Sequence, residues 1–486
     1  MTKPEAEPLE RAVWPSPVEM NALETLFWRA DDHPGMRSNM LGVVVLDRCP
    51  GWDRLVARHE WATRVAPLLR HRVLEPPLRL GRPFWVVDPA FDVRNHLHRV
   101  RLPTPGTTGL LLDLARDVAS APFARERPLW SATLVEGLDD GRGGGAAYLL
   151  KLHHSLSDGI GAAQLITVLL DPAADPPADP LLPPAPRPGA ASPAALLARR
   201  LGRRLAALPP AAVRAARRAR VTPGDGSGRE ARPADRLTDR VVSFARTTLV
   251  PPVPASPLLR ERSRAMRFDA LEVPAEALKA AGRAGGGTLN DAFVAALMGA
   301  FERYHRAFGV ELAALPLVVP ISVRGRADLP AGNRLASTRL AMPVAGPGPA
   351  ERVAESRRRV ARVRTPATLR ALDLLSRPIT PLPGPLVRLV FTGMFRGNDL
   401  IATNFRGLPG GLTLTGARVL GITPFPPLLR GATSIALTTY GGTCHIGATL
   451  DTGAFTAPAA FAACLREGFA EVLALAPQHA ATPRTA

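Results

Sequence analysis

Short apolar runs alternate with longer amphipathic segments in both halves of the chain. The apolar runs are rich in Val, Leu and Ile and are shorter than an ordinary helix, so they predict buried β-strands. These predicted strands span residues 40–46, 146–152, 315–323 and 434–440.

The longer segments carry apolar residues at helical spacing. Residues 108–123 form one predicted helix, and its apolar face holds Leu111, Leu114 and Val118. Residues 288–308 form a second predicted helix, which Thr288 can cap at its start. The apolar face of this second helix holds Phe293, Leu297, Ala300, Phe301 and Tyr304.

Strands and helices mixed in both halves favour an α/β fold class. A chain of 486 residues is too long for one ordinary core, so we expect two domains and a connector. The predicted first domain spans residues 1–171 and the second 256–476, with a linker at 172–255 and a tail at 477–486. A ligand cleft is expected between the two domains.

The predicted linker combines proline and arginine. Its first part, residues 172–193, is too rich in proline for a regular helix or a central strand. Residues 194–208 then place four leucines on one helical face and four arginines on the other, which predicts a basic amphipathic helix. Two interpretations stay open: contact with an anionic membrane surface, or packing against the protein itself.

The net charge of +19 comes almost entirely from arginine, because the chain has only three lysines. Such a charge suits nucleic acid, an anionic membrane or an anionic small ligand, and it can also reflect coding bias. Aromatic residues make up only 5%, and no basic stripe is interleaved with them. We therefore expect no nucleic-acid partner, and an anionic lipid surface or a phosphate-bearing ligand instead.

Other compositional features concern the cell compartment. No run of 18 apolar residues predicts a membrane span, and the first residues are too polar for a secretory signal. We expect a cytoplasmic protein, with peripheral attachment to the inner membrane face as an option. The three cysteines, at positions 49, 444 and 464, lack the spacing of a metal site. We therefore expect ordinary thiols and no bound metal.

The stretch YLLKLHHSLSDGIGAAQLI, residues 148–166, carries the candidate chemistry. A strand ends at His153 and His154, and a helix over 159–170 begins after Asp158. Since neighbouring residues near a strand end point to opposite sides, only one histidine should face a cleft. Simpler readings stay open: Asp158 as a helix cap, histidines satisfied in a core, or a metal site without a third ligand.

A neutral imidazole in a cleft is suited to general-base chemistry near neutral pH. The positive end of the following helix would disfavour a permanently charged ring. No G-x-S-x-G sequence is present and no cysteine lies near the histidines in sequence. The base would therefore act directly on a substrate hydroxyl or amine, without a covalent enzyme intermediate.

HHSLSDG, residues 153–159, resembles the active-site motif of the wax ester synthase/diacylglycerol acyltransferase family, within the CoA-dependent acyltransferase superfamily. The resemblance covers nearly the whole chain outside the linker. It includes SPVEMNALETLFWRA at 16–30, PFWVVDPAFDVRNHLHRVRLPTPG at 83–106, SAPFARERPLW at 120–130, GGTLND at 286–291, VPISVR at 319–324 and GN at 332–333. The implied fold has two domains with mixed sheets and an active-site tunnel between them.

The resemblance also implies roles for single residues. His154 would be the general base that takes a proton from an acceptor hydroxyl, and His153 would support the turn. Asp158 would orient the loop through an arginine, for which Arg324 is a candidate. Two substrate-binding residues are implied: Gly159 would let the backbone approach closely at the helix start, and Asn290 would face the same tunnel and help position the substrate or stabilise the oxyanion.

The implied reaction moves a long-chain acyl group from acyl-CoA to diacylglycerol or a long-chain alcohol, giving triacylglycerol or wax ester. Acyl-CoA is then a substrate, no further cofactor is expected, and an anionic membrane or lipid-droplet surface is a candidate partner. The sequence departs from the family at AFVAA (292–296) and TNFRGLPG (403–410). Two alternatives stay open: a condensation enzyme that uses carrier-protein substrates, and a non-enzymatic lipid-binding protein.

Overall fold

A computed structural model describes most of the 486-residue chain. The described residues are 18–79, 81–172, 182–188, 192–206, 253–263, 265–322, 335–363, 393, 395, 397–405 and 407–476.

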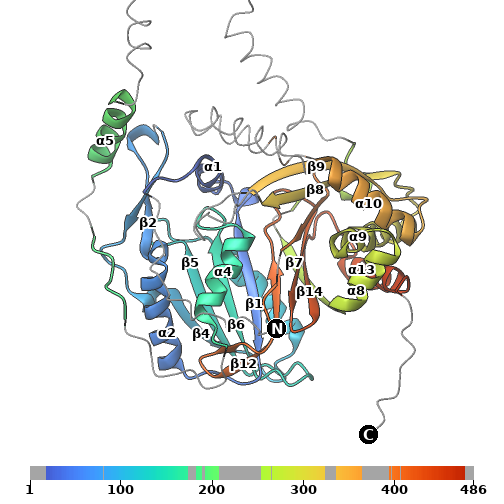
Figure 1. Ribbon diagram of the computed structural model, residues 1–486, viewed down its shortest axis with the longest axis horizontal. Helices are drawn as coiled ribbons and strands as arrows, with labels where there is room; N and C mark the ends of the chain where they lie inside the picture. The colour runs from blue at the N-terminus through green and yellow to red at the C-terminus, as the bar shows by residue number, and fades with distance from the viewer. Residues whose placement is uncertain are drawn as a thin grey trace, which may run out of the picture.

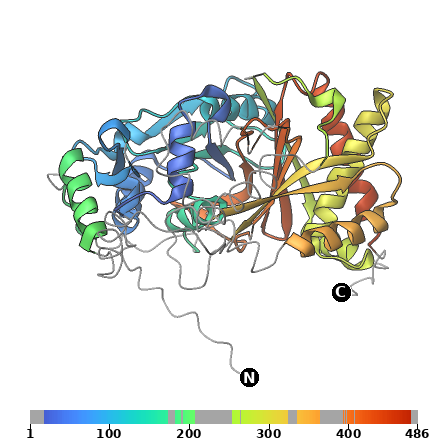
Figure 2. The ribbon, with the colours of Figure 1, turned by 90° about the horizontal axis from the view of Figure 1, so that it is seen from above.

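Two six-stranded sheets form the centre of the described molecule (Figures 1 and 2). In spatial order, the first sheet contains β11 (Thr413–Leu414), β12 (Ala417–Phe425), β1 (Asn39–Leu46), β6 (Ala146–His153), β5 (Trp130–Glu136) and β4 (Leu97–Arg101). The second contains β7 (Met266–Pro274), β14 (Thr443–Asp451), β13 (Thr433–Tyr440), β10 (Leu400–Asn404), β8 (Ala314–Ser322) and β9 (Leu335–Pro343). A short hairpin pairs β2 (His71–Leu74) with β3 (Phe84–Val87).

Both large sheets mix parallel and antiparallel pairs. In the first, β4 runs parallel to β5 and the other neighbours are antiparallel. In the second, β10 runs parallel to both β13 and β8, and the remaining pairs are antiparallel. The predicted α/β class and the expected two-domain, mixed-sheet fold are confirmed.

Helices cover the sheets unevenly. Four of them gather beside the second sheet, at the right of Figure 1: α8 (Ala275–Ala284), α9 (Leu289–Ala307), α10 (Pro349–Val363) and α13 (Pro458–Leu473). Five others belong to the first half of the chain: α1 (Ala22–Ala30), α2 (Trp52–Val65), α3 (Thr108–Ser120), α4 (Gly159–Leu169) and α5 (Pro193–Ala206).

The hydrophobic core beside the second sheet is built around α9, which is buried on all sides over residues 291–301. Thr288 and Asp291 form a capping box at its start, so the first-turn backbone groups are satisfied locally. Gly468 of α13 lies so close that a Cβ there would stand 2.4 Å from the Ala296 carbonyl oxygen. This glycine allows α13 to pack directly against the backbone of α9.

Most predicted elements occur at the expected places. The strands at 40–46, 146–152, 315–323 and 434–440 and the helix at 288–308 are confirmed to within two residues. The helix predicted over 108–123 was wrong at its end, because α3 stops at Ser120. Pro122 disfavours the helical conformation for the residue before it, which explains the earlier stop.

The chain crosses between the halves in a way the sequence did not indicate. Strands β11 and β12 come from the segment assigned to the second domain, yet β12 pairs with β1 in the first sheet, with Leu41 opposite Phe425. The division at residues 171 and 256 stays a prediction, to which the structure adds this crossing segment.

Two glycines allow β12 to lie close to β14 of the second sheet. A Cβ on Gly447 would lie 2.0 Å from the Pro424 carbonyl oxygen, and one on Gly421 would lie 2.7 Å from the ring of His445. Neither glycine has a positive φ, so the constraint is space and not backbone conformation. The two sheets therefore approach at a distance that only glycine permits at Gly447.

No helix in the described part of the chain is long and apolar enough to cross a membrane.

The Gly447 contact leads to a stability prediction. Gly447→Ala places a methyl group against the Pro424 backbone, so β12 must shift, and we expect a loss of about 2 kcal/mol or more in the free energy of unfolding. The urea midpoint measures the effect. Gly202→Ala is the control, because a Cβ at Gly202 has nothing within 4 Å. Equal midpoints for both variants would contradict the prediction.

Candidate active site

An apolar pocket lies between the two sheets and opens to solvent at its mouth. Its walls come from α1, β1, β6 and α4 on one side and from β8, β10 and β13 on the other, with residues 422–429 joining them. Most lining side chains are aliphatic or aromatic. Such a lining suits a long hydrocarbon chain.

Among the described residues that line this pocket, His154 is the one with a titratable side chain. It follows directly on β6, and its backbone N–H donates to the Ser38 carbonyl at 2.9 Å, while that of His153 donates to Leu129 at 3.0 Å. The turn is thus held from both sides. His153 does not line the pocket and is 1% exposed, so the two rings lie in different environments.

The surroundings of His154 keep its ring neutral. Burial lowers its pKa from the ordinary 6.5 to about 4, against the opposing charge of Asp158 and hydrogen bonds with the backbone of His154 itself and Ser157. The ring also stacks on Phe27, with centroids 4.4 Å apart and planes 3° from parallel. At neutral pH the imidazole therefore has a lone pair suited to accept a proton.

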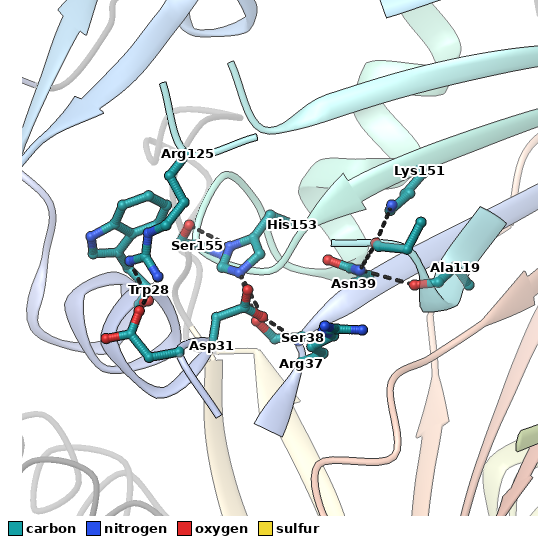
Figure 3. A network of polar contacts seen from close by, with 12 residues as sticks. Trp28, Asp31, Arg37, Ser38, Asn39, Ala119, Arg125, Lys151, His153 and Ser155 are labelled. Carbon is teal, nitrogen blue, oxygen red and sulfur yellow. Dashed lines mark hydrogen bonds and ion pairs between the residues drawn. The ribbon is translucent and has the colours of Figure 1, made fainter. Parts of the chain in front are cut away.

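His153 is held by polar partners, as Figure 3 shows. Its Nδ1 lies 2.6 Å from the Ser155 hydroxyl and accepts the Ser155 backbone N–H at 3.1 Å. Its Nε2 lies 3.1 Å from the Ser38 hydroxyl and 3.3 Å from an Asp31 carboxylate oxygen. These contacts leave His153 no direct route to the pocket.

Asp158 caps helix α4. Its carboxylate accepts the Gly161 backbone N–H at 2.9 Å, and the residue is 1% exposed. This bond is the N-cap interaction expected of aspartate before a helix. The suggested arginine partner, Arg324, lies outside the described residues.

The two predicted substrate-binding residues lie in different places. Gly159 lines the pocket, and a Cβ there would meet Phe405 at 3.6 Å, an ordinary van der Waals contact. Asn290, in the first turn of α9, is not a lining residue of the pocket; its Oδ1 accepts from Asn404 Nδ2 at 3.4 Å. This pair joins the start of α9 to the end of β10.

Three features of the site escaped the sequence analysis. Phe27 and Asp31 contact the two histidines from α1, and Ser434 lines the pocket while its hydroxyl is fully buried. No described group hydrogen-bonds to that hydroxyl, so it can serve a polar atom of a bound molecule. The segment 16–30 was noticed as a motif, but nothing local indicated what its residues touch.

A metal site was one alternative for the histidine cluster. Within the described ranges, no three His, Cys, Asp or Glu side chains lie together in a way that could hold a metal ion.

Comparison with known proteins gives consistent likenesses over nearly the whole chain. Residues 20–293 match the wax ester synthase/diacylglycerol acyltransferase catalytic domain, and residues 331–472 match the WS/DGAT C-terminal domain. A putative diacylglycerol O-acyltransferase of Mycobacterium tuberculosis is 35% identical over 464 residues, covering 94% of this chain and 92% of the relative. A probable diacylglycerol O-acyltransferase of the same species is 28% identical, and the match covers 96% of this chain and 98% of that relative.

Solved structures share the fold. The wax ester synthase/diacylglycerol acyltransferase from Marinobacter aquaeolei VT8 has a TM-score of 0.62 at 20% identity, covering 95% of this chain and all of that one. The first condensation domain of the calcium-dependent antibiotic synthetase has a TM-score of 0.56 at 16% identity, and the match covers 94% of this chain and 97% of that one.

Fold, pocket and sequence likeness together define an acyltransferase. The chain belongs to the wax ester synthase/diacylglycerol acyltransferase family, as its motifs had indicated.

The buried histidines lead to a prediction for acid stability. Burial lowers the pKa of His154, and likewise of core residue His59, to about 4. The unfolded chain binds these protons near pH 6.5, so acidification from 6.5 toward 4 favours unfolding, by about 2 kcal/mol per histidine at pH 5. Thermal unfolding at pH 7 and pH 5 measures the loss. His154→Gln should remove the part of this pH-dependent loss of stability that His154 causes. A pH dependence equal to that of the wild type would contradict the prediction.

Proposed function

We propose that the protein transfers a long-chain acyl group from acyl-CoA to a lipid hydroxyl. Diacylglycerol would give triacylglycerol, and a long-chain alcohol would give a wax ester. The observation that carries the proposal is His154, a neutral imidazole on the wall of a mostly apolar pocket. The relatives named as diacylglycerol O-acyltransferases support the substrate class.

In the proposed reaction His154 acts as general base. It takes the proton of the acceptor hydroxyl while the hydroxyl oxygen attacks the thioester carbonyl carbon. The carbon–sulfur bond then breaks, and the proton on His154 passes to the departing CoA sulfur. The acyl group moves directly to the acceptor, so the mechanism contains no covalent enzyme intermediate.

The neighbouring residues would support this step in distinct ways. His153 and Asp158 would hold the turn and the start of α4, and neither would exchange a proton with substrate. Gly159 would leave room for substrate beside the helix start. Asn290 would act from the rim through its bond to Asn404, positioning substrate or stabilising the oxyanion.

Lipid acceptors also imply a surface from which they enter. We expect a cytoplasmic enzyme that contacts an anionic membrane or lipid droplet peripherally. Helix α5, which is basic and amphipathic in sequence, is the candidate contact, although its arginine side chains at 199, 200, 203 and 204 lie outside the described ones.

The proposal predicts release of CoA thiol from a long-chain acyl-CoA only when an acceptor is present. His154→Ala should reduce this release by about a hundredfold or more, because the hydroxyl loses its base. A panel of diacylglycerol, hexadecanol and a short alcohol, with products separated by chromatography, identifies the acceptor. Equal thiol release by the His154→Ala protein would refute the role of the base. Turnover with an acylated carrier protein but not with acyl-CoA would favour the condensation alternative.

The open position of Gly159 predicts a separate effect on substrate binding. Gly159→Ala adds a methyl group without a clash with Phe405, so the melting temperature should not fall. The methyl group narrows the pocket, and we expect the KM for long-chain acyl-CoA to rise about threefold or more. Steady-state kinetics alongside thermal unfolding measure both. A lower melting temperature with an unchanged KM would contradict this prediction.

A further inference from the structure

Helix α1 contacts both histidines of the turn. Phe27, in its last turn, stacks on the ring of His154, and Asp31, its C-cap, lies 3.3 Å from His153 Nε2. The two residues are four positions apart, so they lie on the same side of the helix. The Asp31 N–H also donates to the Phe27 carbonyl at 3.1 Å, which fixes one residue relative to the other.

The contacts of His153 define its tautomer. The Ser155 backbone N–H can only donate, so Nδ1 of His153 must accept and carries no proton. The ring proton is therefore on Nε2, which faces Asp31 and the Ser38 hydroxyl (Figure 3). Asp31 is thus an acceptor aimed at the one N–H that the His153 ring has to donate.

Asp31 also acts on the backbone of His154. The Ser38 N–H donates to the Asp31 carboxylate at 3.1 Å, and the Ser38 carbonyl accepts the His154 N–H at 2.9 Å. Burial raises the pKa of Asp31, but the hydrogen bond with His153, the Ser38 N–H and the charge of Arg125 lower it below its ordinary value. The carboxylate is therefore ionised at neutral pH and stays an acceptor for both partners.

Phe27 defines the plane of the other ring. Nearly parallel stacking at 4.4 Å opposes rotation of the His154 imidazole and covers one of its faces. Phe27 is itself 3% exposed and lines the pocket, so it separates His154 from solvent on that side.

The helix that carries these two residues is firmly anchored. Arg29 is fully buried and pairs with Glu75 at 3.1 Å, while Trp28 Nε1 donates to Glu75 at 2.7 Å. Asn21 and Glu24 form a capping box at the helix start. Residues 27 and 31 are therefore presented by a rigid element and not by a mobile loop.

We infer that α1 orients the histidine pair, with Asp31 a positioning residue for His153 and for the His154 backbone, and Phe27 one for the His154 ring. This inference rests on the proposed role of His154 as base. A base whose ring plane and backbone are fixed in advance loses less orientational freedom in the reaction step than one that must be ordered there.

Asp31 is tested by Asp31→Ala and Asp31→Asn, with Asp32→Asn as the control. Asp32 pairs with Arg79 and Arg125 and makes no contact with the histidines. We expect kcat to fall about tenfold to a hundredfold in Asp31→Ala, less in Asp31→Asn, with the KM for acyl-CoA within about twofold. All assays run below the melting temperature of each variant. If Asp31→Ala does not fold, Asp31→Asn must still show a lower kcat with an almost unchanged KM. A kcat equal to that of Asp32→Asn would overturn the role of Asp31.

Phe27 is tested through the titration of His154. Asp158 and His153 both act on this ring: the charge of Asp158 raises its pKa and that of His153 lowers it. Phe27→Leu leaves both in place but admits water, so the acid limb of the kcat/KM profile should move up by about one pH unit. Phe425→Leu is the control, because it removes a pocket aromatic that stacks on Phe268. Its acid limb should stay where the wild-type limb lies.

A second measurement separates this inference from the proposed function. Histidine-labelled protein gives the His154 pKa by NMR without any turnover, and His154→Gln identifies the signal. A raised pKa in Phe27→Leu supports the covering role of Phe27 even if transfer activity is never found. An unchanged pKa and acid limb would overturn it while leaving a His154→Ala loss of activity, and with it the general base, intact.

Discussion

The close crossing of β12 over β14 is the constraint on which the rest of the structure depends. The Pro424 carbonyl occupies the space where any side chain at Gly447 would begin. This contact brings the second sheet against the first, and the pocket with His154 on its wall exists because both sheets contribute to it. A larger separation would open that wall to water, and the imidazole would lose the burial that keeps it neutral.

Burial of His154 has two opposite effects. It supplies a neutral base in surroundings that suit a hydrocarbon chain, and it makes the folded state sensitive to acid. The site tolerates this because its other titratable members are satisfied locally: Asp158 by the Gly161 N–H, and His153 by Ser155 and Asp31. Polar groups around the turn therefore hold its geometry, and His154 is the member of the cluster that lines the pocket.

The sequence predicted the features that depend on local patterns of residues. Periodicity located the main strands and helices, and the HHSLSDG motif located the turn with His154 at the pocket. What it could not supply were partners distant in sequence. Nothing in residues 413–425 indicates that they pair with β1, and nothing near Phe27 or Asp31 indicates contact with histidines more than a hundred positions later. Asn290 bonds to Asn404 of β10, a partner from another element that the sequence did not indicate, and its expected role toward substrate stays a prediction.

The position of β12 has a consequence for synthesis of the protein. The first sheet has β1 and β6 early in the chain, and in the part that the structure describes the other edge of β1 pairs with β12. While the ribosome is still translating the second half, β1 presents an unpaired edge with apolar side chains on both faces. The nascent first half is thus exposed to aggregation until residues 417–425 emerge, and a chaperone that shields that edge would raise the yield of folded enzyme.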